Sequence, residues 1–332
     1  MQKIWHKAIG VDFGSENLRV WWSGQKEIVS IPSYVALDDR TNLLAIGEDA
    51  RALSERTSTG ITVIHPIERG VIHDADMAKL LLRAVMGKVH WLSWFVAPAM
   101  MISVPAGATV VQRERAEKLL ESVGAQQAYT IPQSLAAAMG GGVPSQDSSG
   151  SVVVQLGGGI VEAAAISLGG IVATASNEFG GKALIEQLRR VGRERYGAEI
   201  SYETLRKALP QIRLGSTKES EIEMLGKDIN SGDPLRVYLQ SRFYEPVLLE
   251  HLEQLIITLK QLLSQVPPAI TTDIVDRGIL LSGGLAQLHG LPSLLTQRLE
   301  VPCAMLEDPE NSVIKGIAYA LENLEEYSSI YG

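Results

Sequence analysis

The chain has 332 residues, of which 45% are hydrophobic and 20% charged, and its formal net charge is -8 at pH 7. This length exceeds what one hydrophobic core usually serves, so two lobes are expected, and the composition excludes a largely disordered chain. The net negative charge gives no general attraction to a nucleic-acid backbone, so we expect no nucleic-acid partner.

The N-terminus opens with seven residues, MQKIWHK, which are too few and too polar for a signal peptide. No uninterrupted apolar run in the chain reaches the roughly 18 residues of a membrane span. We therefore expect a cytoplasmic protein. Residues 9–22, IGVDFGSENLRVWW, then predict a strand, a tight glycine turn and a second strand, because β-forming residues flank a short polar segment.

An aromatic segment, residues 87–98, precedes a predicted strand at residues 100–104. Tryptophan favours the lipid interface, and Lys88 suits anionic headgroups, so we predict a membrane-facing loop. Trp5, between two lysines, would add a second weak contact. The alternative is a buried strand between the lobes. The residues assigned to membrane contact are Trp91, Leu92, Trp94 and Phe95.

The elements that follow are mostly helices joined by polar loops. Apolar residues at helical spacing predict helices at residues 108–123 and 243–264, the second of which ends before Pro267. The polar residues 145–150 indicate a crossover between two halves, and residues 226–233 are interpreted as a loop. Four arginines in residues 189–195 indicate a solvated helix face. Cys303, the only cysteine, excludes an internal disulfide and is interpreted as a buried apolar residue.

The strand–glycine–strand pattern of residues 9–22 has a second copy at residues 152–166, VVVQLGGGIVEAAAI. This copy places Gln155 opposite Asp12 and Gly157 opposite Gly14. A third glycine turn occurs at residues 278–284. One such turn alone is usually an ordinary hairpin. Three together indicate duplicated halves whose glycine loops approach a shared phosphate-bearing ligand.

These motifs and their order resemble the superfamily of actin, sugar kinases and DnaK-type chaperones, and within it the MreB family. The resemblance spans nearly the whole chain. It is carried by DFGS at 12–15, HPIERGVI at 65–72, SVPAG at 103–107, SLAAA at 134–138, ISLGGI at 166–171, DRGILLSGG at 276–284 and EDP at 307–309.

The resemblance implies an α/β fold, actin-like and duplicated on a ribonuclease-H-like plan, with two lobes and an interlobe nucleotide cleft. The first lobe would span residues 1–144, with a small subdomain at about 31–66, and the second residues 145–310, with a small subdomain at about 181–245. Residues 311–332 would form a helix that returns to the first lobe. The family also implies ATP binding, self-assembly into filaments at the cytoplasmic face of the cell membrane, and membrane partners in wall synthesis or cell shape.

The resemblance assigns binding residues by position. Glu203 and Arg206 would bracket the adenosine, although a surface ion pair three residues apart explains them equally well. Asp12 would hold magnesium indirectly, through water. The remaining cofactor-binding assignments are Gly14, Ser15, Asn17, Gln155, Gly157, Gly158, Gly159, Gly180, Gly181, Gly283 and Gly284.

The sequence departs from the family at acidic positions. Gln155 replaces an aspartate that helps to hold magnesium, so magnesium binding is in doubt. Gln133 replaces the glutamate that positions or activates the attacking water, and an amide can orient water without taking its proton. Ile160 and Val161 replace two threonines, Lys182 replaces an aspartate and Leu285 a glycine. We therefore expect reduced or absent ATP hydrolysis.

Two other functions stay open. A non-polymerising actin-like adaptor or scaffold would bind a partner without forming filaments. A small-molecule kinase of the same superfamily would need a carboxylate to take a substrate proton, and none is evident near Gln133 or Gln155.

Overall fold

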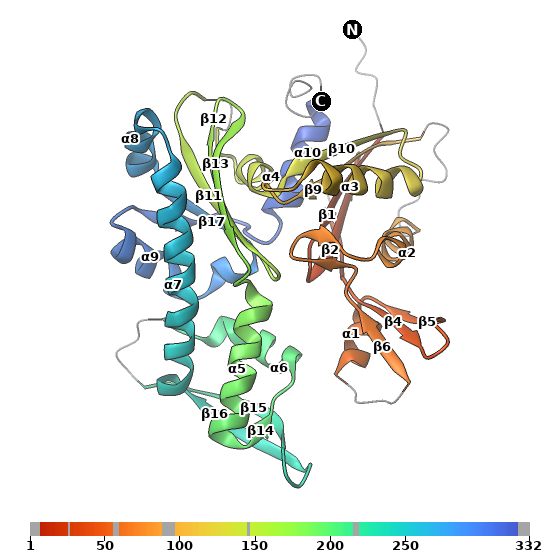
Figure 1. The fold of residues 1–332 in the computed structure, drawn as a ribbon, viewed down its shortest axis with the longest axis vertical. Coiled ribbons are helices and arrows are strands. Elements are labelled where there is room, and N and C mark those ends of the chain that lie inside the picture. The colour runs from red at the N-terminus through yellow and green to blue at the C-terminus, as the bar shows by residue number, and fades with distance from the viewer. Residues whose placement is uncertain are drawn as a thin grey trace.

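The computed structural model describes residues 7–25, 27–55, 60–87, 97–144, 147–214 and 219–324. They form two lobes, each built around a five-stranded sheet (Figure 1). The first lobe's sheet has the order β10-β9-β1-β2-β3, in which β1 pairs antiparallel with β2 and parallel with β9. Its strands are β1 (Ala8–Phe13), β2 (Asn17–Trp22), β3 (Val29–Pro32), β9 (Ala99–Val104) and β10 (Gln127–Pro132).

The second lobe repeats this topology. Its order is β13-β12-β11-β17-β18, again with an antiparallel hairpin partner on one side of the first strand and a parallel strand on the other. The strands are β11 (Ser151–Leu156), β12 (Val161–Ser167), β13 (Gly170–Asn177), β17 (Ile279–Ser282) and β18 (Cys303–Met305). The predicted actin-like, duplicated α/β fold is therefore confirmed.

Two helices lie between the sheets and join the lobes, namely α4 (Gln133–Gly140) and α10 (Ser312–Glu322). Their apolar side chains share one buried cluster with Met101 of the first sheet and Val153 of the second. The helices pack backbone to backbone: a Cβ at Gly140 would overlap the carbonyl of Ser312, and one at Gly316 that of Ala136. The close packing of α4 on α10 therefore joins the two sheets through one continuous core.

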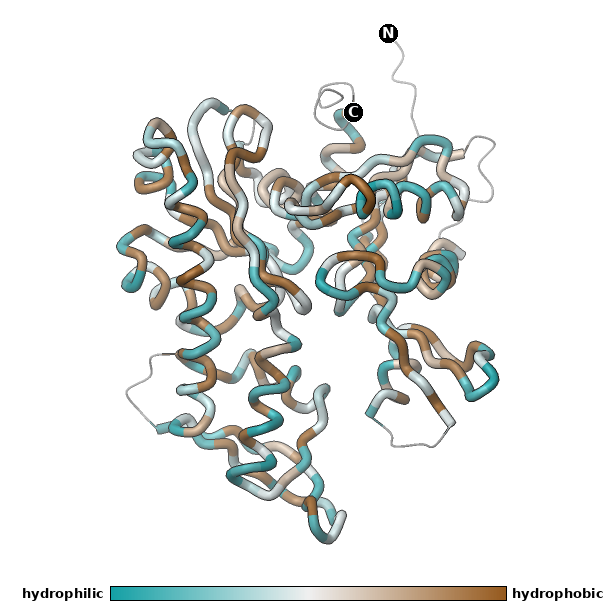
Figure 2. The backbone as a smooth tube through the Cα atoms, in the orientation of Figure 1, coloured by the Kyte–Doolittle hydropathy of each residue, from teal (hydrophilic) through white to brown (hydrophobic). Residues whose placement is uncertain are grey.

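The outer faces of the sheets are covered by amphipathic helices, and hydrophilic and hydrophobic residues alternate around α5 and α7 (Figure 2). The predicted helices 108–123 and 243–264 are confirmed as α3 and α7. A capping box between Thr109 and Gln112 starts α3. The covering helices are α2 (Ala75–Met86), α3 (Val110–Ser122), α7 (Ser241–Gln265), α8 (Pro268–Arg277) and α9 (Leu291–Leu299), whereas α5 (Gly181–Tyr196) packs beside α7 towards the end of the lobe.

A small sheet extends from each lobe (Figure 1), and the first lobe also contains a two-stranded ribbon. The first small sheet contains β4 (Val35–Asp38), β5 (Leu43–Ile46) and β6 (Ile61–Ile64), covered by α1 (Glu48–Ser54). The second contains β14 (Ala198–Glu199), β15 (Glu221–Asp228) and β16 (Pro234–Gln240), next to α6 (Tyr202–Ala208). The ribbon is β7 (Ile67–Glu68) with β8 (Val71–Ile72).

The predicted loop at residues 226–233 is wrong in its first half. Strand β15 continues through Gly226, which pairs with Leu235, as far as Asp228. Gly226 is there for close packing, since a Cβ would lie 3.0 Å from the carbonyl oxygen of Glu199. Only the turn after Asp228 is irregular, and the Asp228 carboxylate accepts hydrogen bonds from the amides of Asn230 and Ser231.

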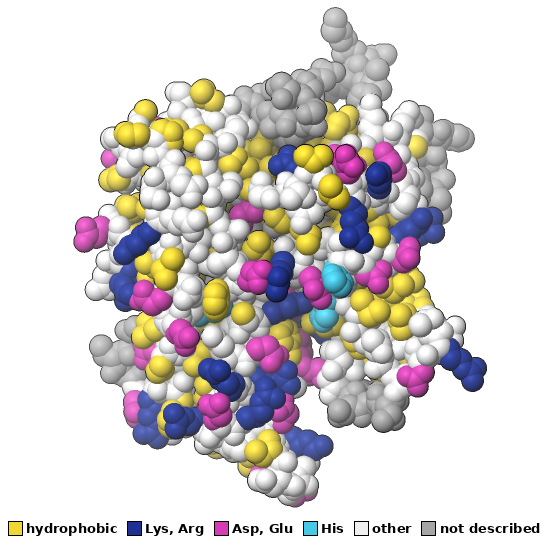
Figure 3. Space-filling model, viewed as in Figure 1, with side chains coloured by type: hydrophobic (Ala, Val, Ile, Leu, Met, Phe, Trp, Pro, Cys, Tyr) yellow, Lys and Arg dark blue, Asp and Glu magenta, His cyan; other side chains and the backbone are white. Residues whose placement is uncertain are grey.

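Two surface predictions have different outcomes. Three of the four arginines of α5 form ion pairs, as Arg189 does with Glu186 and Glu199, and cationic and acidic side chains alternate over this part of the molecule (Figure 3). The solvated-face interpretation is thus confirmed. Cys303, predicted to be buried, is only partly so, because β18 is the edge strand of its sheet. Partial burial raises the pKa of its thiol to about 11.

Candidate functional site

The two glycine loops have the same internal geometry. In the first, the amide of Gly14 donates to the carbonyl of Asn17 at 3.0 Å, and in the second the amide of Gly157 donates to that of Ile160 at 3.1 Å. Each loop joins the first strand of a lobe's sheet to its antiparallel neighbour. The structure therefore brings two equivalent turns to opposite sides of one cleft.

The cleft is a single pocket that both lobes line. Of the sequence-predicted cleft residues, all but Gly180 and Glu203 line it. Gly180 lies directly behind, as the residue that caps α5, and a Cβ there would lie 2.6 Å from the carbonyl oxygen of Gly158. The predicted residues that do line the pocket are Asp12, Gly14, Ser15, Asn17, Gln133, Gln155, Gly157, Gly158, Gly159, Gly181, Arg206, Gly283 and Gly284.

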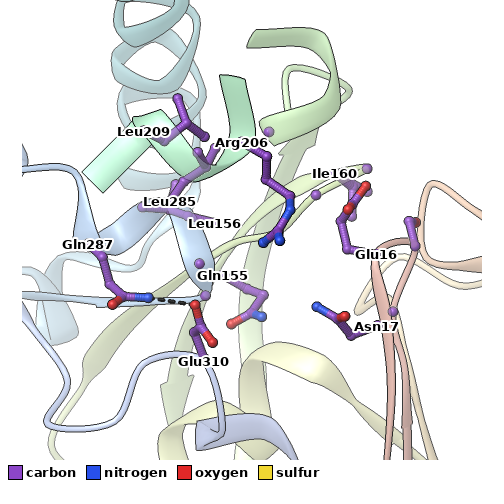
Figure 4. A pocket seen from close by; sticks show the side chains of 18 of the residues that line it. Glu16, Asn17, Gln155, Leu156, Ile160, Arg206, Leu209, Leu285, Gln287 and Glu310 are labelled. Atoms are coloured by element: carbon purple, nitrogen blue, oxygen red, sulfur yellow. Dashed lines mark hydrogen bonds between the residues drawn. The ribbon is translucent and has the colours of Figure 1, made fainter. Parts of the chain in front are cut away.

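The pocket has a polar end and an apolar end. Figure 4 shows the side chains of Asn17, Gln155 and Arg206 converging on one space from three different elements. Away from the glycine loops, Leu209 and Leu285 face the pocket. Polar groups at one end and aliphatic side chains at the other suit a ligand with a charged tail and a flat apolar head.

At the floor of the polar end, Asp12 is 5% exposed. Its Oδ1 accepts a hydrogen bond of 2.9 Å from the Ser103 hydroxyl, and its Oδ2 lies 3.5 Å from Nη1 of Arg19. Nη2 of Arg19 lies 3.9 Å from Oε2 of Glu310. Burial raises the pKa of the Asp12 carboxyl, and the charge of Arg19 opposes that shift.

The second loop presents an amide at the equivalent place. Gln155 pairs with Glu162 across the β11–β12 hairpin, as Asp12 pairs with Arg19 across β1–β2. The Oε1 atom of Gln155 is buried and has no hydrogen-bond partner among the described residues. A buried acceptor of this kind is costly unless a ligand or water satisfies it. Gln133, the first residue of α4, is also buried at the pocket wall.

A polar cluster crosses the cleft beside the first loop. The Tyr202 hydroxyl donates a 2.9 Å hydrogen bond to Oε1 of Glu16, and Nζ of Lys182 lies 3.5 Å from the same oxygen. Lys182 also lies 3.2 Å from Nδ1 of His65. Burial and the charge of Lys182 lower the pKa of His65 to about 4, so the imidazole is neutral at pH 7.

Glu203 and Arg206 form the ion pair that the sequence allowed, and the pair lies at the cleft. Nε of Arg206 donates to Oε2 of Glu203 at 2.9 Å, while Arg206 also lines the pocket. Glu203 reaches the first lobe, where its Oε2 lies 3.6 Å from Nε of Arg51. Although burial opposes the shift, Arg206 and Arg51 hold the pKa of Glu203 below its ordinary value.

The residues present do not fit a magnesium site. Magnesium is held by carboxylates, phosphates and water, and three carboxylates line the pocket. Asp12 is engaged by Ser103 and Arg19, Glu16 by Tyr202 and Lys182, and Glu310 by Arg19 and Gln287. Within the described ranges, no three His, Cys, Asp or Glu side chains form a cluster that could hold a metal ion.

Sequence reasoning missed Arg19, Glu16 and Glu310. Arg19 had a signal, because it lies two residues after Asn17 on the same strand and therefore on the same face. Glu310 had no such local signal, because its loop approaches β2 only in the folded structure. Glu162 was also missed: it is 1% exposed, and its Oε2 accepts a 2.5 Å hydrogen bond from the amide of Ala106 in the other lobe.

The predicted membrane residues, Trp91, Leu92, Trp94 and Phe95, lie outside the described residues, as does Trp5. In the described part of the chain, α2, with Gly87 as its cap, precedes these membrane-assigned residues, and β9 follows them. None of the helices that the structure describes has the length and apolar character needed to cross a bilayer.

Known structures share this fold. The structure of MreB5 of Spiroplasma citri bound to AMPPNP superposes with a TM-score of 0.91 and 25% sequence identity, covering 98% of each chain. The MamK double helical filament gives a TM-score of 0.79 at 18% identity, covering 96% of this chain and 98% of that chain.

Sequence comparisons agree over nearly the full length. The cell shape-determining protein Mbl of Bacillus subtilis (strain 168) is 32% identical over 324 residues, which cover 96% of this chain and 97% of Mbl. The cell shape-determining protein MreB of Escherichia coli (strain K12) is 32% identical over 325 residues, which cover 96% of this chain and 94% of MreB. A family model described as MreB/Mbl protein matches residues 6–329. The chain therefore belongs to the MreB/Mbl family of actin-like proteins.

Proposed function

We propose that this protein is an actin-like filament subunit that binds ATP between its lobes and takes part in determining cell shape and organising wall synthesis. The observation that carries the proposal is the pair of equivalent glycine turns, at Gly14 and Gly157, on opposite sides of one pocket. Support comes from relatives named as cell shape-determining proteins, from a neighbour bound to AMPPNP and from a filament structure of the same fold.

ATP hydrolysis in this cleft is slow or absent. The two side chains that would act on the metal and the attacking water are both amides, Gln155 and Gln133. Ile160 adds an aliphatic group to the same wall. Losing one electrostatic stabiliser of the transition state commonly costs about a hundredfold in rate. We therefore assign the nucleotide a structural role in the subunit, with little turnover.

The filaments lie at the cytoplasmic face of the cell membrane, where membrane proteins of wall synthesis or cell shape are their partners. The support for this part is the amphipathic aromatic segment between α2 and β9, together with Lys88.

Light scattering of the purified full-length chain, with and without ATP, tests the filament function. A subunit that assembles gives scattering that rises with protein concentration above a threshold, and electron microscopy of the same samples shows filaments. A protein that remains monomeric under every nucleotide condition would contradict the filament function and would instead support an actin-like adaptor.

A further inference from the structure

We propose that the cleft binds the phosphate chain of a nucleotide without a divalent metal ion, and that Arg19 and the Gln155 amide supply the interactions a metal would otherwise provide. This inference rests on the proposed nucleotide site and defines its chemistry. It follows from the placement of three groups: a fixed cation, an unpartnered amide and a set of engaged carboxylates.

The fixed cation is Arg19. It lies on β2 two residues after Asn17, and both side chains line the pocket. Its side chain is only 13% exposed, and it lies between Asp12 and Glu310 at 3.5 and 3.9 Å. A guanidinium has five N–H donors and stays charged in proteins. Because these two contacts involve only part of that set, Arg19 retains donors for an anionic ligand.

The unpartnered amide is that of Gln155, whose Oε1 is buried without a hydrogen-bond partner among the described residues. A carboxylate at this position would repel a phosphate unless a cation lay between them. An amide has no charge, and its terminal –NH₂ group carries two N–H donors. Gln155 can therefore donate directly to a phosphate oxygen.

The carboxylates around the polar end are already engaged. Asp12 accepts from Ser103 and faces Arg19, Glu16 accepts from Tyr202 and faces Lys182, and Glu310 accepts a 2.7 Å hydrogen bond from Gln287 (Figure 4). A hydrated magnesium ion would have to compete with these contacts for the carboxylate oxygens. In this cleft, phosphate oxygens would therefore bind to the Arg19 guanidinium and to amide N–H groups.

Calorimetric titration of the full-length protein with ATP, once in EDTA and once in excess Mg²⁺, tests this chemistry. The expected affinities in the two solutions differ by less than about threefold, equivalent to less than about 0.7 kcal/mol. Arg19→Leu should weaken binding in EDTA by about tenfold or more, and Arg19→Lys should weaken it less. The matched control is Arg236→Leu, which removes an exposed arginine on β16 and should change neither affinity.

A second variant keeps the test decisive if Arg19→Leu does not fold, because that change leaves Asp12 buried without its cation. Gln155→Asp should introduce metal dependence, weakening binding in EDTA by about tenfold while Mg²⁺ restores it. Wild-type binding that occurs only with Mg²⁺, or an affinity in EDTA that neither Arg19→Leu nor Gln155→Asp lowers, would overturn the inference and leave the nucleotide function intact. Failure to bind ATP in either solution would instead contradict the nucleotide function itself.

Discussion

The hydroxyl of Tyr202 donates a 2.9 Å hydrogen bond to Oε1 of Glu16, and thereby joins helix α6 of the second lobe to the first glycine loop. Lys182 adds its charge 3.5 Å from the same oxygen. The contact spans the opening of the pocket, and Tyr202 and Glu16 both line it. Closure of the cleft and the position of the first loop therefore depend on the same carboxylate.

Removing this hydrogen bond should speed nucleotide release. Tyr202→Phe keeps the ring and deletes only the donor, and a hydrogen bond to a charged group contributes about 1.5–3 kcal/mol. We expect fluorescent ATP to dissociate about tenfold faster in a stopped-flow displacement experiment. Tyr238→Phe, an exposed tyrosine on β16, is the matched control. Equal release rates for Tyr202→Phe and the wild type would show that the contact does not hold the cleft closed.

Gly180 is expected to be intolerant of even one methyl group. A Cβ there would lie 2.6 Å from the carbonyl oxygen of Gly158, so Gly180→Ala must displace the second glycine loop or the start of α5. Nucleotide affinity should fall by about tenfold or more, as measured by calorimetry. Gly107→Ala is the control, because its Cβ would meet no atom within 4 Å. If both variants bind ATP equally well, the loop is not held by this contact.

Stability should depend on pH through His251. This residue is 6% exposed, and burial lowers the pKa of its imidazole from 6.5 to about 4. Between pH 6.5 and pH 4 the imidazole binds a proton in the unfolded chain but not in the folded protein. The stability that His251 contributes by staying neutral is therefore complete above pH 6.5 and is lost as the pH falls toward 4. Through His251 alone, the free energy of unfolding falls by about 2 kcal/mol between pH 7 and pH 5.

Urea unfolding at pH 7 and pH 5 measures this effect. His251→Gln should reduce the pH dependence of the free energy of unfolding by about the same amount. The raised pKa values of Asp12 and Glu162 increase the stability of the folded protein as the pH falls, which opposes the effect of His251. The comparison is therefore made between wild type and variant, as the change in the free energy of unfolding from pH 7 to pH 5. If His251→Gln and the wild type lose the same stability between pH 7 and pH 5, the imidazole takes up its proton as readily in the folded protein as in the unfolded chain.

Membrane binding is predicted to depend on the aromatic loop. Replacing Trp91, Trp94 and Phe95 with serine removes the side chains that favour the lipid interface. Co-sedimentation with anionic vesicles should be lost, while circular dichroism and the melting temperature stay unchanged. A loss of folding in the same variant would support the alternative of a buried strand between the lobes.

Much of the fold was predictable because it is duplicated. The β-forming residues on each side of the Gly14 turn recur around Gly157, and both segments become the same hairpin in equivalent sheets. The prediction failed at Gly226, where glycine was taken as a turn signal. In the structure it allows β14 to approach β15, a contact between segments about 30 residues apart that local pattern cannot reveal.

The site was predictable where backbone geometry defines it. Glycine loops carry a local signal, whereas the charge balance of the cleft depends on which side chains meet in space. The pairs Arg19 with Glu310, and Glu16 with Tyr202, join residues far apart in sequence. The loss of an aspartate at Gln155 was visible in the sequence, but the cation that accompanies it was not interpreted as part of the site.

A crystal structure of the protein grown with AMPPNP and Mg²⁺ would show directly whether the cleft binds phosphates without a metal ion. We expect phosphate density between the Gly14 and Gly157 turns, within hydrogen-bonding distance of Arg19 and the Gln155 amide, with no metal peak beside Asp12. A cleft empty at saturating AMPPNP, or phosphates bound through an octahedral metal ion, would contradict it.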